Sequence, residues 1–274
     1  MTGTTRPARP TLEQLRAVAQ PPEVRNRKNA EHWTAELYLR HISIYLTSVL
    51  VRTPISANGV TGLMILSGWA ISACLIIPGI WGPLLAVFFS QLQLYFDCSD
   101  GEVARWRGTQ SPKGIFLDKI GHYTTEGLIP IALGLRCLGG FGLFGTDPGQ
   151  AYMLLFLGAL LAFLIVLNKA QNEMVHASRA LAGMDKLPDT AAAKEVPVAT
   201  MIGRLRRLAR FLPFHRVLHS VEMSLLILAA SVISLIAGEA VLGERWLLYV
   251  MVPAVLLVNI GHFVAIMASP RLRK

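Results

Sequence analysis

Charged residues are scarce in this chain: they make up 16% of its 274 residues, whereas a soluble domain usually carries about 25%. Hydrophobic residues reach 53%. This balance excludes a disordered or collagen-like chain and argues against an ordinary soluble enzyme. Acidic residues are the scarcer kind, since 17 Asp and Glu stand against 26 Lys and Arg, for a net charge of +9. Because the basic residues lie between long apolar runs, they predict cytoplasmic loops of a membrane protein rather than a nucleic-acid-binding surface.

Cysteine is also rare, and the first thirty residues contain no apolar segment of signal-peptide type. Cys74, Cys98 and Cys137 are odd in number and far apart, which excludes a disulfide framework and a CxxC zinc site. We expect them to be small apolar fillers. Residues 1–33 are predicted to be a polar cytoplasmic tail with little order, and residues 34–274 a single membrane domain.

Six segments are candidates for helices that cross a bilayer core, which needs roughly 20 apolar residues. They are Asn58–Ile77, Trp81–Arg105, Gly114–Cys137, Tyr152–His176, Glu222–Ala237 and Trp246–Ala268. Lys and Arg concentrate before the first span, between the second and third, after the fourth and at the C-terminus. The positive-inside rule then places both termini in the cytoplasm, and an even number of spans agrees. The predicted fold is all-α, an integral membrane bundle of six transmembrane helices, and we expect it in a bacterial cell membrane.

An amphipathic helix is predicted before the first span, over Thr34–Arg52. Apolar residues recur there at helical spacing, and polar ones fill the other side. The apolar positions are Leu39, Ile42, Leu46, Val49 and Leu50. Such a helix lies on the membrane surface or packs on the cytoplasmic face of the bundle, and the two placements are compatible.

Two predicted spans carry acidic residues, which are costly inside a membrane and mark functional sites. Asp97 and Asp100 lie on one face of the second span, beside Gly101 and Ala104. On the third span, a stripe at four-residue spacing runs through Gly114, Asp118 and His122. At 1.5 Å per residue, Asp97 lies about 24 Å from the outer end of its span and Asp118 about 6 Å from Gly114. The carboxylates of both spans therefore meet at one depth, near the cytoplasmic boundary.

Three carboxylates at one depth would repel each other unless a divalent cation lies between them. Hard oxygen ligands suit Mg²⁺ or Mn²⁺, which usually bind a substrate's phosphates as well. The small side chains beside the carboxylates leave room for a bulky group, and Arg105 is suited to pair with phosphate or with an aspartate. The alternative for Asp97 and Asp100 is a helix end that is ion-paired with Arg105 and Arg107. For Glu102 we expect a solvated charge or one at the lipid edge.

This pattern resembles the CDP-alcohol phosphotransferase (phosphatidyltransferase) family, whose signature is D-x2-D-G-x2-A-R-x8-G-x3-D-x3-D. Seven positions match in one register: Asp97, Asp100, Gly101, Ala104, Arg105, Gly114 and Asp118. The stretch from Thr53 to Thr61 is similar to the family's entry into the first span, although Ala57 replaces a common proline. The resemblance covers about residues 34–268, including the six spans and the surface helix.

The resemblance implies transfer of a phosphoryl-alcohol unit from a CDP-linked donor to an acceptor hydroxyl, with release of CMP, in phospholipid or head-group synthesis. Asp97, Asp100 and Asp118 would hold Mg²⁺ or Mn²⁺ at the diphosphate. The substrate-binding residues would be Asn58, Thr61, Gly101, Ala104, Arg105 and Gly114. One reactant would be a lipid, the site would face the cytoplasm, and family members often form homodimers. The acceptor alcohol and the donor are not defined by the sequence.

His122 is the departure, because the family's fourth aspartate, usually assigned as the base, is a histidine here. Three interpretations stay open: the imidazole is the catalytic base, it is a metal ligand, or the chain is a very slow or binding-only relative. A membrane prenyltransferase also uses Asp-rich helices, but it would need a second DxxxD cluster on a later span. A transporter would often show inverted repeats, which the chain lacks.

The fourth and sixth spans carry further polar residues. Asn168, Asn172 and His176 share one helical face, which either helps to bind a polar acceptor or forms a solvated helix end. Asn259 and His262 are predicted to be a buried hydrogen-bonded pair rather than a substrate contact.

Overall fold

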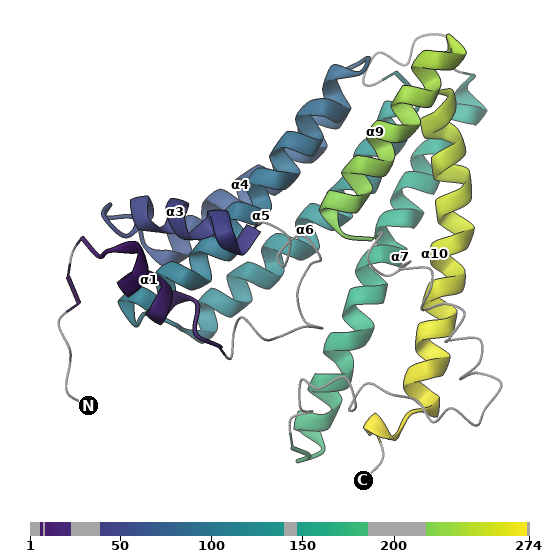
Figure 1. The fold of residues 1–274 in the computed structure, drawn as a ribbon. Coiled ribbons are helices and arrows are strands. Elements are labelled where there is room, and N and C mark those ends of the chain that lie inside the picture. The colour runs from purple at the N-terminus through teal and green to yellow at the C-terminus, as the bar shows by residue number, and fades with distance from the viewer. Residues whose placement is uncertain (1–5, 8, 23–38, 140–146, 186–217, 273–274) are drawn as a thin grey trace. The chain divides into compact units, whose positions relative to one another are not determined.

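The computed structural model describes residues 6–7, 9–22, 39–139, 147–185 and 218–272, and every element in these ranges is helical (Figure 1). The helices are α1 Leu12–Ala19, α3 Arg40–Leu50, α4 Ala57–Leu75, α5 Trp81–Arg107, α6 Pro112–Arg136, α7 Pro148–Leu181, α9 Ser220–Ala237, α10 Leu242–Ala268 and the short 3₁₀ helix η4 Pro270–Leu272. The all-α prediction is confirmed for the described residues. Each predicted span coincides with one of these helices.

Within the described residues, four helices are long and apolar enough to cross a membrane: α4, α7, α9 and α10. Helices α5 and α6 have 27 and 25 residues, so they are long enough, but their charged residues lower the mean hydropathy. The count of six spans therefore stays a prediction. Helix α7 has 34 residues, or about 51 Å, and is longer than a bilayer core of about 30 Å.

The chain divides into two compact units. The first unit comprises residues 1–69 and 88–122, and the second comprises residues 70–87 and 123–274. Helices α4, α5 and α6 are each divided between the two units. All predicted site residues belong to the first unit.

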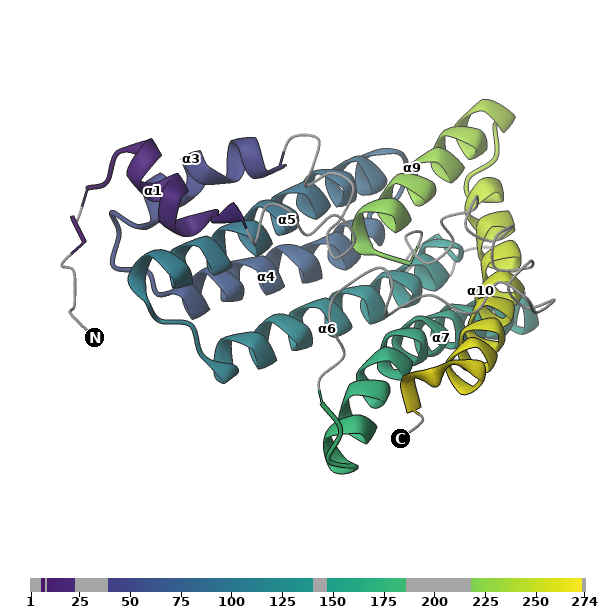
Figure 2. The ribbon, with the colours of Figure 1, turned by 60° about the horizontal axis from the view of Figure 1, so that its bottom comes forward.

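Helix α1 forms part of the core of the first unit, next to α3 (Figure 2). Its N-terminus has a capping box: Thr11 Oγ1 accepts from the Gln14 backbone N–H at 3.2 Å, and Gln14 Oε1 accepts from the Thr11 N–H at 3.0 Å. Leu15 and Ala19, one turn apart, are fully buried among apolar residues of α3, α4 and α5. Residues 12–19 thus differ from the expected poorly ordered tail, while the boundary at residue 33 lies outside the described residues.

Helix α3 lies within the predicted amphipathic segment, and its buried face combines the hydroxyl residues with apolar ones, including Leu50 of the predicted apolar positions. Ser43, Ile44 and Thr47 are buried, whereas Ile42 and Val49 are exposed. The hydroxyls turn inward because a buried carboxylate, described below, binds them. Residues 34–38 lie outside the described part of the chain, and the placement of this helix on a membrane surface stays a prediction.

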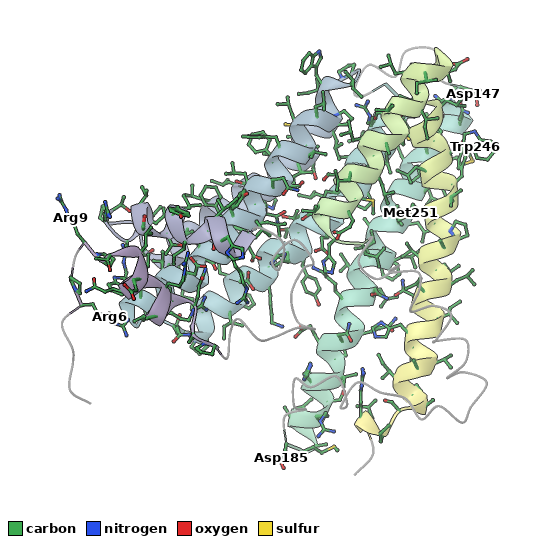
Figure 3. All side chains as sticks on the ribbon, in the orientation of Figure 1. Arg6, Arg9, Asp147, Asp185, Trp246 and Met251 are labelled. Atoms are coloured by element: carbon green, nitrogen blue, oxygen red, sulfur yellow. The ribbon has the colours of Figure 1, made fainter. Side chains whose placement is uncertain are left out.

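In the second unit, α6 and α7 cross closely at Gly134 and Gly158. A Cβ on Gly158 would lie 2.8 Å from the Pro130 carbonyl oxygen, so a side chain there would force the helices apart. On α10, Trp246 is exposed, whereas Met251 is buried (Figure 3).

Polar side chains join α7 to α10 in the same unit. Asn168 and His262 lie 3.3 Å apart between Nδ2 and Nδ1, and Gln171 donates to Asn259 at 3.2 Å. Asn168 is buried, whereas Asn172 and His176 are exposed. The three residues that were predicted to share one helical face thus differ in their surroundings. Asn259 is buried, as predicted, but His262 is only half-buried, and each of the two contacts a residue of α7.

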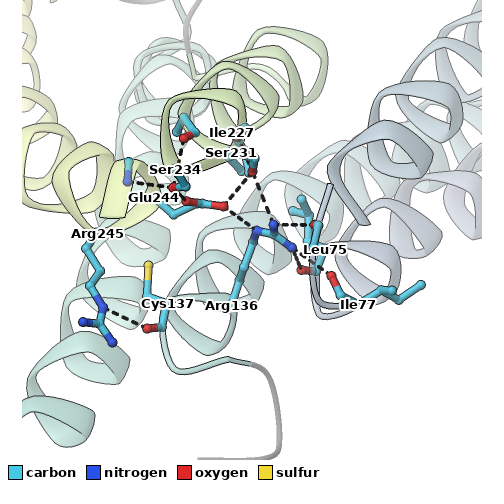
Figure 4. Close-up of polar contacts among 12 residues, drawn as sticks. Leu75, Ile77, Arg136, Cys137, Ile227, Ser231, Ser234, Glu244 and Arg245 are labelled. Carbon is cyan, nitrogen blue, oxygen red and sulfur yellow. Dashed lines mark hydrogen bonds and ion pairs between the residues drawn. The ribbon is translucent and has the colours of Figure 1, made fainter. Parts of the chain in front are cut away.

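A buried ion pair also lies in the second unit (Figure 4). Arg136 Nε donates to Glu244 Oε1 at 3.0 Å, and both side chains are almost completely buried. The other guanidinium nitrogens donate to the carbonyls of Leu75, Ile77 and Gly79. Ser231 and Ser234 donate to the Glu244 carboxylate. Every charge in this cluster has partners, as a buried ion pair requires.

Candidate functional site

The C-terminal half of α5 and the N-terminal half of α6 carry the signature residues. Helix α5 ends at Arg107, and Gly108 directly after it has a φ of +66° and lets the chain turn. Helix α6 begins with Pro112, and the Ser111 hydroxyl accepts from the Gly114 backbone N–H at 3.2 Å. This short helical hairpin places Asp97 and Asp100 of α5 in the same unit as Asp118 and His122 of α6.

His122 lies between two carboxylates. Its Nε2 atom is 3.0 Å from Asp97 Oδ1 and 3.5 Å from Asp118 Oδ1. One ligand atom from each of these residues lies within 4.8 Å of the others. Two oxygen donors and one imidazole nitrogen at such spacing fit a single divalent ion, with Mn²⁺ tolerating the nitrogen better than Mg²⁺. The sequence-predicted meeting of α5 and α6 carboxylates is thus seen at Asp97 and Asp118.

Asp100 is bound differently. Its Oδ2 atom accepts from the Thr61 hydroxyl of α4 at 2.6 Å, and this hydroxyl lies 3.2 Å from the Ala57 carbonyl oxygen. Thr61 therefore joins the first turn of α4 to the signature helix. This contact brings together a predicted metal ligand and a predicted substrate residue.

The remaining predicted substrate residues lie on the same three helices. Asn58 adjoins Gly114, because a Cβ on Gly114 would lie 3.2 Å from Asn58 Oδ1. A Cβ on Gly101 would lie 3.1 Å from Arg105 Nη1, so the guanidinium rests against this glycine. Ala104 packs against the apolar core of the first unit. The absence of a side chain at Gly101 thus leaves room for the Arg105 guanidinium, and its absence at Gly114 leaves room for the Asn58 side chain.

Glu102 corrects one expectation, because it is buried rather than solvated or at a lipid edge. Its Oε1 atom accepts from Gln20 Nε2 and from the Ser43 hydroxyl, each at 2.7 Å. Its Oε2 atom accepts from the Thr47 hydroxyl at 2.6 Å. Three donors satisfy the carboxylate and join α1 and α3 to α5.

Arg107 binds the backbone before α4. Its guanidinium donates to the Thr53 carbonyl at 2.7 Å and also to those of Leu50, Val51 and Ile55. The cation therefore holds the connection between α3 and α4. This role differs from the alternative in which Arg107 serves as an ion-pair partner of the aspartates.

Sequence reasoning missed the contacts of residues 6–20 with this site. Arg105 Nε donates to the Ala19 carbonyl at 2.6 Å, and Gln20 binds Glu102. The local signals were the Thr-x-x-Gln capping box and the apolar pair Leu15 and Ala19 at i, i+4. These signals predict a short helix with one apolar side, but they do not predict which helices it packs against.

A family model matches residues 54–269 and describes a CDP-alcohol phosphatidyltransferase. The match covers most of the chain and includes the whole signature. The chain belongs to the CDP-alcohol phosphatidyltransferase family. No curated protein matches it significantly.

Proposed function

We propose that the chain is a metal-dependent transferase that moves a phosphoryl-alcohol group from a CDP-linked donor to an acceptor hydroxyl. The acceptor oxygen forms a bond to the phosphorus that carries the alcohol, and the bond from this phosphorus to CMP breaks. CMP leaves with the bonding electron pair, and the acceptor proton passes to a base. The observation that carries this proposal is the cluster of Asp97, Asp118 and His122 within the family-matched region.

The carboxylates of Asp97, Asp100 and Asp118 would hold Mg²⁺ or Mn²⁺, which would neutralise charge on the diphosphate and on the leaving CMP. Arg105 would bind a phosphate oxygen through its terminal nitrogens, because they lie beside Gly101. Gly101, Ala104 and Gly114 would leave space for the nucleotide. Asn58 and Thr61 would border it from α4.

His122 would act as the base. In this role the neutral imidazole would donate its Nε2–H to the Asp97 carboxylate at 3.0 Å, so its lone pair would be on Nδ1 and would take the acceptor proton. The Asp97 carboxylate would stabilise the ring once it is protonated. In the alternative role, Nε2 without its proton would bind a metal ion held by Asp97 and Asp118. The two roles predict different behaviour for a His122→Ala variant.

The test is CMP release from a set of CDP-linked donors by purified protein, with Mg²⁺ or Mn²⁺ and candidate alcohols, read by mass spectrometry. Asp97→Asn should abolish release, because it removes a carboxylate charge from the cluster. Asp147→Asn is the matched control, since Asp147 caps α7 in the other unit and should not affect turnover. A fully active Asp97→Asn enzyme would overturn the proposal.

His122→Ala separates base from ligand. As a base, His122 is required for turnover but not for donor binding, so turnover should fall while the affinity for CDP persists. As a ligand, its loss would raise the metal concentration needed for CDP binding. Unchanged turnover in this variant would contradict the base assignment.

The setting proposed for this reaction is a membrane. Residues 34–274 would form one domain with six spans, with α3 at the cytoplasmic surface and both termini in the cytoplasm. The site would open to the cytoplasm and to lipid, so that a water-soluble reactant meets a lipid. We further propose that the chain forms homodimers, by analogy with the family.

A further inference from the structure

The N-terminal helix α1 lies outside the family-matched region, which begins at residue 54, yet it contacts the signature helix α5. We propose that α1 is a positioning element of the donor site: through the Ala19 carbonyl it fixes the Arg105 guanidinium in the orientation that receives the CDP diphosphate. This inference rests on the proposed function.

Apolar burial anchors α1. Leu15 and Ala19 are fully buried, and their cluster includes Val103 and Trp106 of α5. Burying a leucine side chain removes apolar surface from water and so stabilises the docked helix. The helix therefore docks beside the turn of α5 that contains Arg105.

A polar contact fixes the end of α1 next to Ala19. Gln20 is buried, and its Nε2 atom donates to Glu102 Oε1 at 2.7 Å and to the Arg40 carbonyl at 2.9 Å. Glu102 is a buried charge, so the loss of one of its donors is costly. The carboxylate thus favours the docked position of α1.

Arg6 adds a third contact ahead of the helix. It donates to the Arg105 carbonyl at 2.6 Å and to the Trp106 carbonyl, and its guanidinium lies 5.6 Å from the Trp106 ring centroid. A cation at the C-terminus of α5 is favoured by the negative end of the helix dipole. Arg6 before α1 and Ala19 at its end therefore both contact α5 at Arg105 or at the next residue.

The consequence concerns the Arg105 side chain. The guanidinium is planar with donors in fixed directions, so anchoring Nε at the Ala19 carbonyl also sets the directions of the terminal nitrogens. Nη1 then lies beside Gly101, one residue from Asp100. An arginine that is already oriented loses less conformational freedom when it binds a phosphate.

Coupling of this kind is reciprocal: if docked α1 favours CDP binding, bound CDP must favour docked α1. The test measures amide hydrogen exchange of residues 12–20 in the full chain, with Mg²⁺ and with or without saturating CDP. CDP should slow exchange in α1. This comparison needs no variant, so it remains decisive even if a substitution prevents folding.

A pair of variants tests the residue that fixes α1. Gln20→Ala should raise the dissociation constant of CDP about tenfold or more, as loss of one hydrogen bond to a charged group predicts, and should reduce the protection of α1 by CDP. Arg16→Ala is the control, because Arg16 is exposed on the same helix. It should leave the affinity and the protection unchanged.

The outcomes distinguish this inference from the proposed function. Bound CDP with unchanged or faster exchange in α1 overturns the inference alone, as does an equal affinity for CDP in the Gln20 and Arg16 variants. Failure to bind CDP at any concentration overturns both.

Discussion

At the scale of single residues, the site depends on where side chains are missing as much as on where charges lie. Gly101 faces the Arg105 guanidinium, and Gly114 faces the Asn58 side chain. In both places a polar side chain lies against helix backbone that carries no side chain. A larger residue at either glycine would displace this polar side chain, because it provides the nearest atoms to an added Cβ.

Gly101→Ala should weaken CDP binding, because its Cβ would lie 3.1 Å from Arg105 Nη1 and displace the guanidinium. We expect the dissociation constant, measured by calorimetry with Mg²⁺, to rise about three- to tenfold, the cost of one weakened charged hydrogen bond. Gly62→Ala is the matched control, since nothing lies within 4 Å of a Cβ there. An unchanged affinity in Gly101→Ala would place the diphosphate away from Arg105.

At the scale of elements, buried charges hold helices together in both units. Glu102 joins α1 and α3 to α5, and the Arg136–Glu244 pair joins α6, α9 and α10 to the turn after α4. The two clusters differ in composition, because Glu102 has neutral donors whereas Glu244 has an arginine and two serines. Both clusters hold helices together, and neither is part of the proposed reaction site.

Arg136→Met should destabilise the fold strongly, because it leaves the Glu244 carboxylate buried without its cation. A loss of about 3–5 kcal/mol is expected for breaking a buried pair, measured by thermal unfolding in detergent. Arg245→Met is the control, since Arg245 donates to the Cys137 carbonyl and is only partly buried. The double variant Arg136→Met/Glu244→Leu should recover part of the lost stability, because it removes the buried charge as well. Equal melting temperatures of Arg136→Met and Arg245→Met would contradict a stabilising role of the buried pair.

At the scale of the whole molecule, the prediction of six spans requires that α5 and α6 cross the membrane. In the part of the chain that the structure describes, four helices meet the criteria of length and composition, and six were predicted. Either number is even and leaves the termini on one side. The turn between α5 and α6 is cytoplasmic only if both helices cross.

Accessibility of introduced cysteines decides between these topologies. In a chain without its native cysteines, Thr109→Cys in the α5–α6 turn should resist a membrane-impermeant maleimide on intact cells. Glu239→Cys, in the turn between α9 and α10, should react and serves as the positive control. Reaction of both residues would support four spans and exclude a cytoplasmic site.

Much of this protein could be predicted from local patterns. Apolar runs gave the positions of six helices, since length and hydropathy are properties of one segment. The spacing of Asp97, Asp100 and Asp118 predicted that carboxylates of two helices meet, because a helix fixes which residues share a face. In the structure the group that could hold a metal ion consists of Asp97, Asp118 and His122. The fate of Glu102 could not be predicted, since its donor Gln20 lies 82 residues away in the sequence.

The order of residues alone therefore determined the helical class, the family signature and the pairing of acidic helix faces. Only the folded chain decided which polar groups become buried, among them Glu102, Gln20, Arg136 and Glu244. The physical reason is that a buried polar group is stable only when donors or acceptors from other helices satisfy it, and the tertiary structure alone brings such partners together.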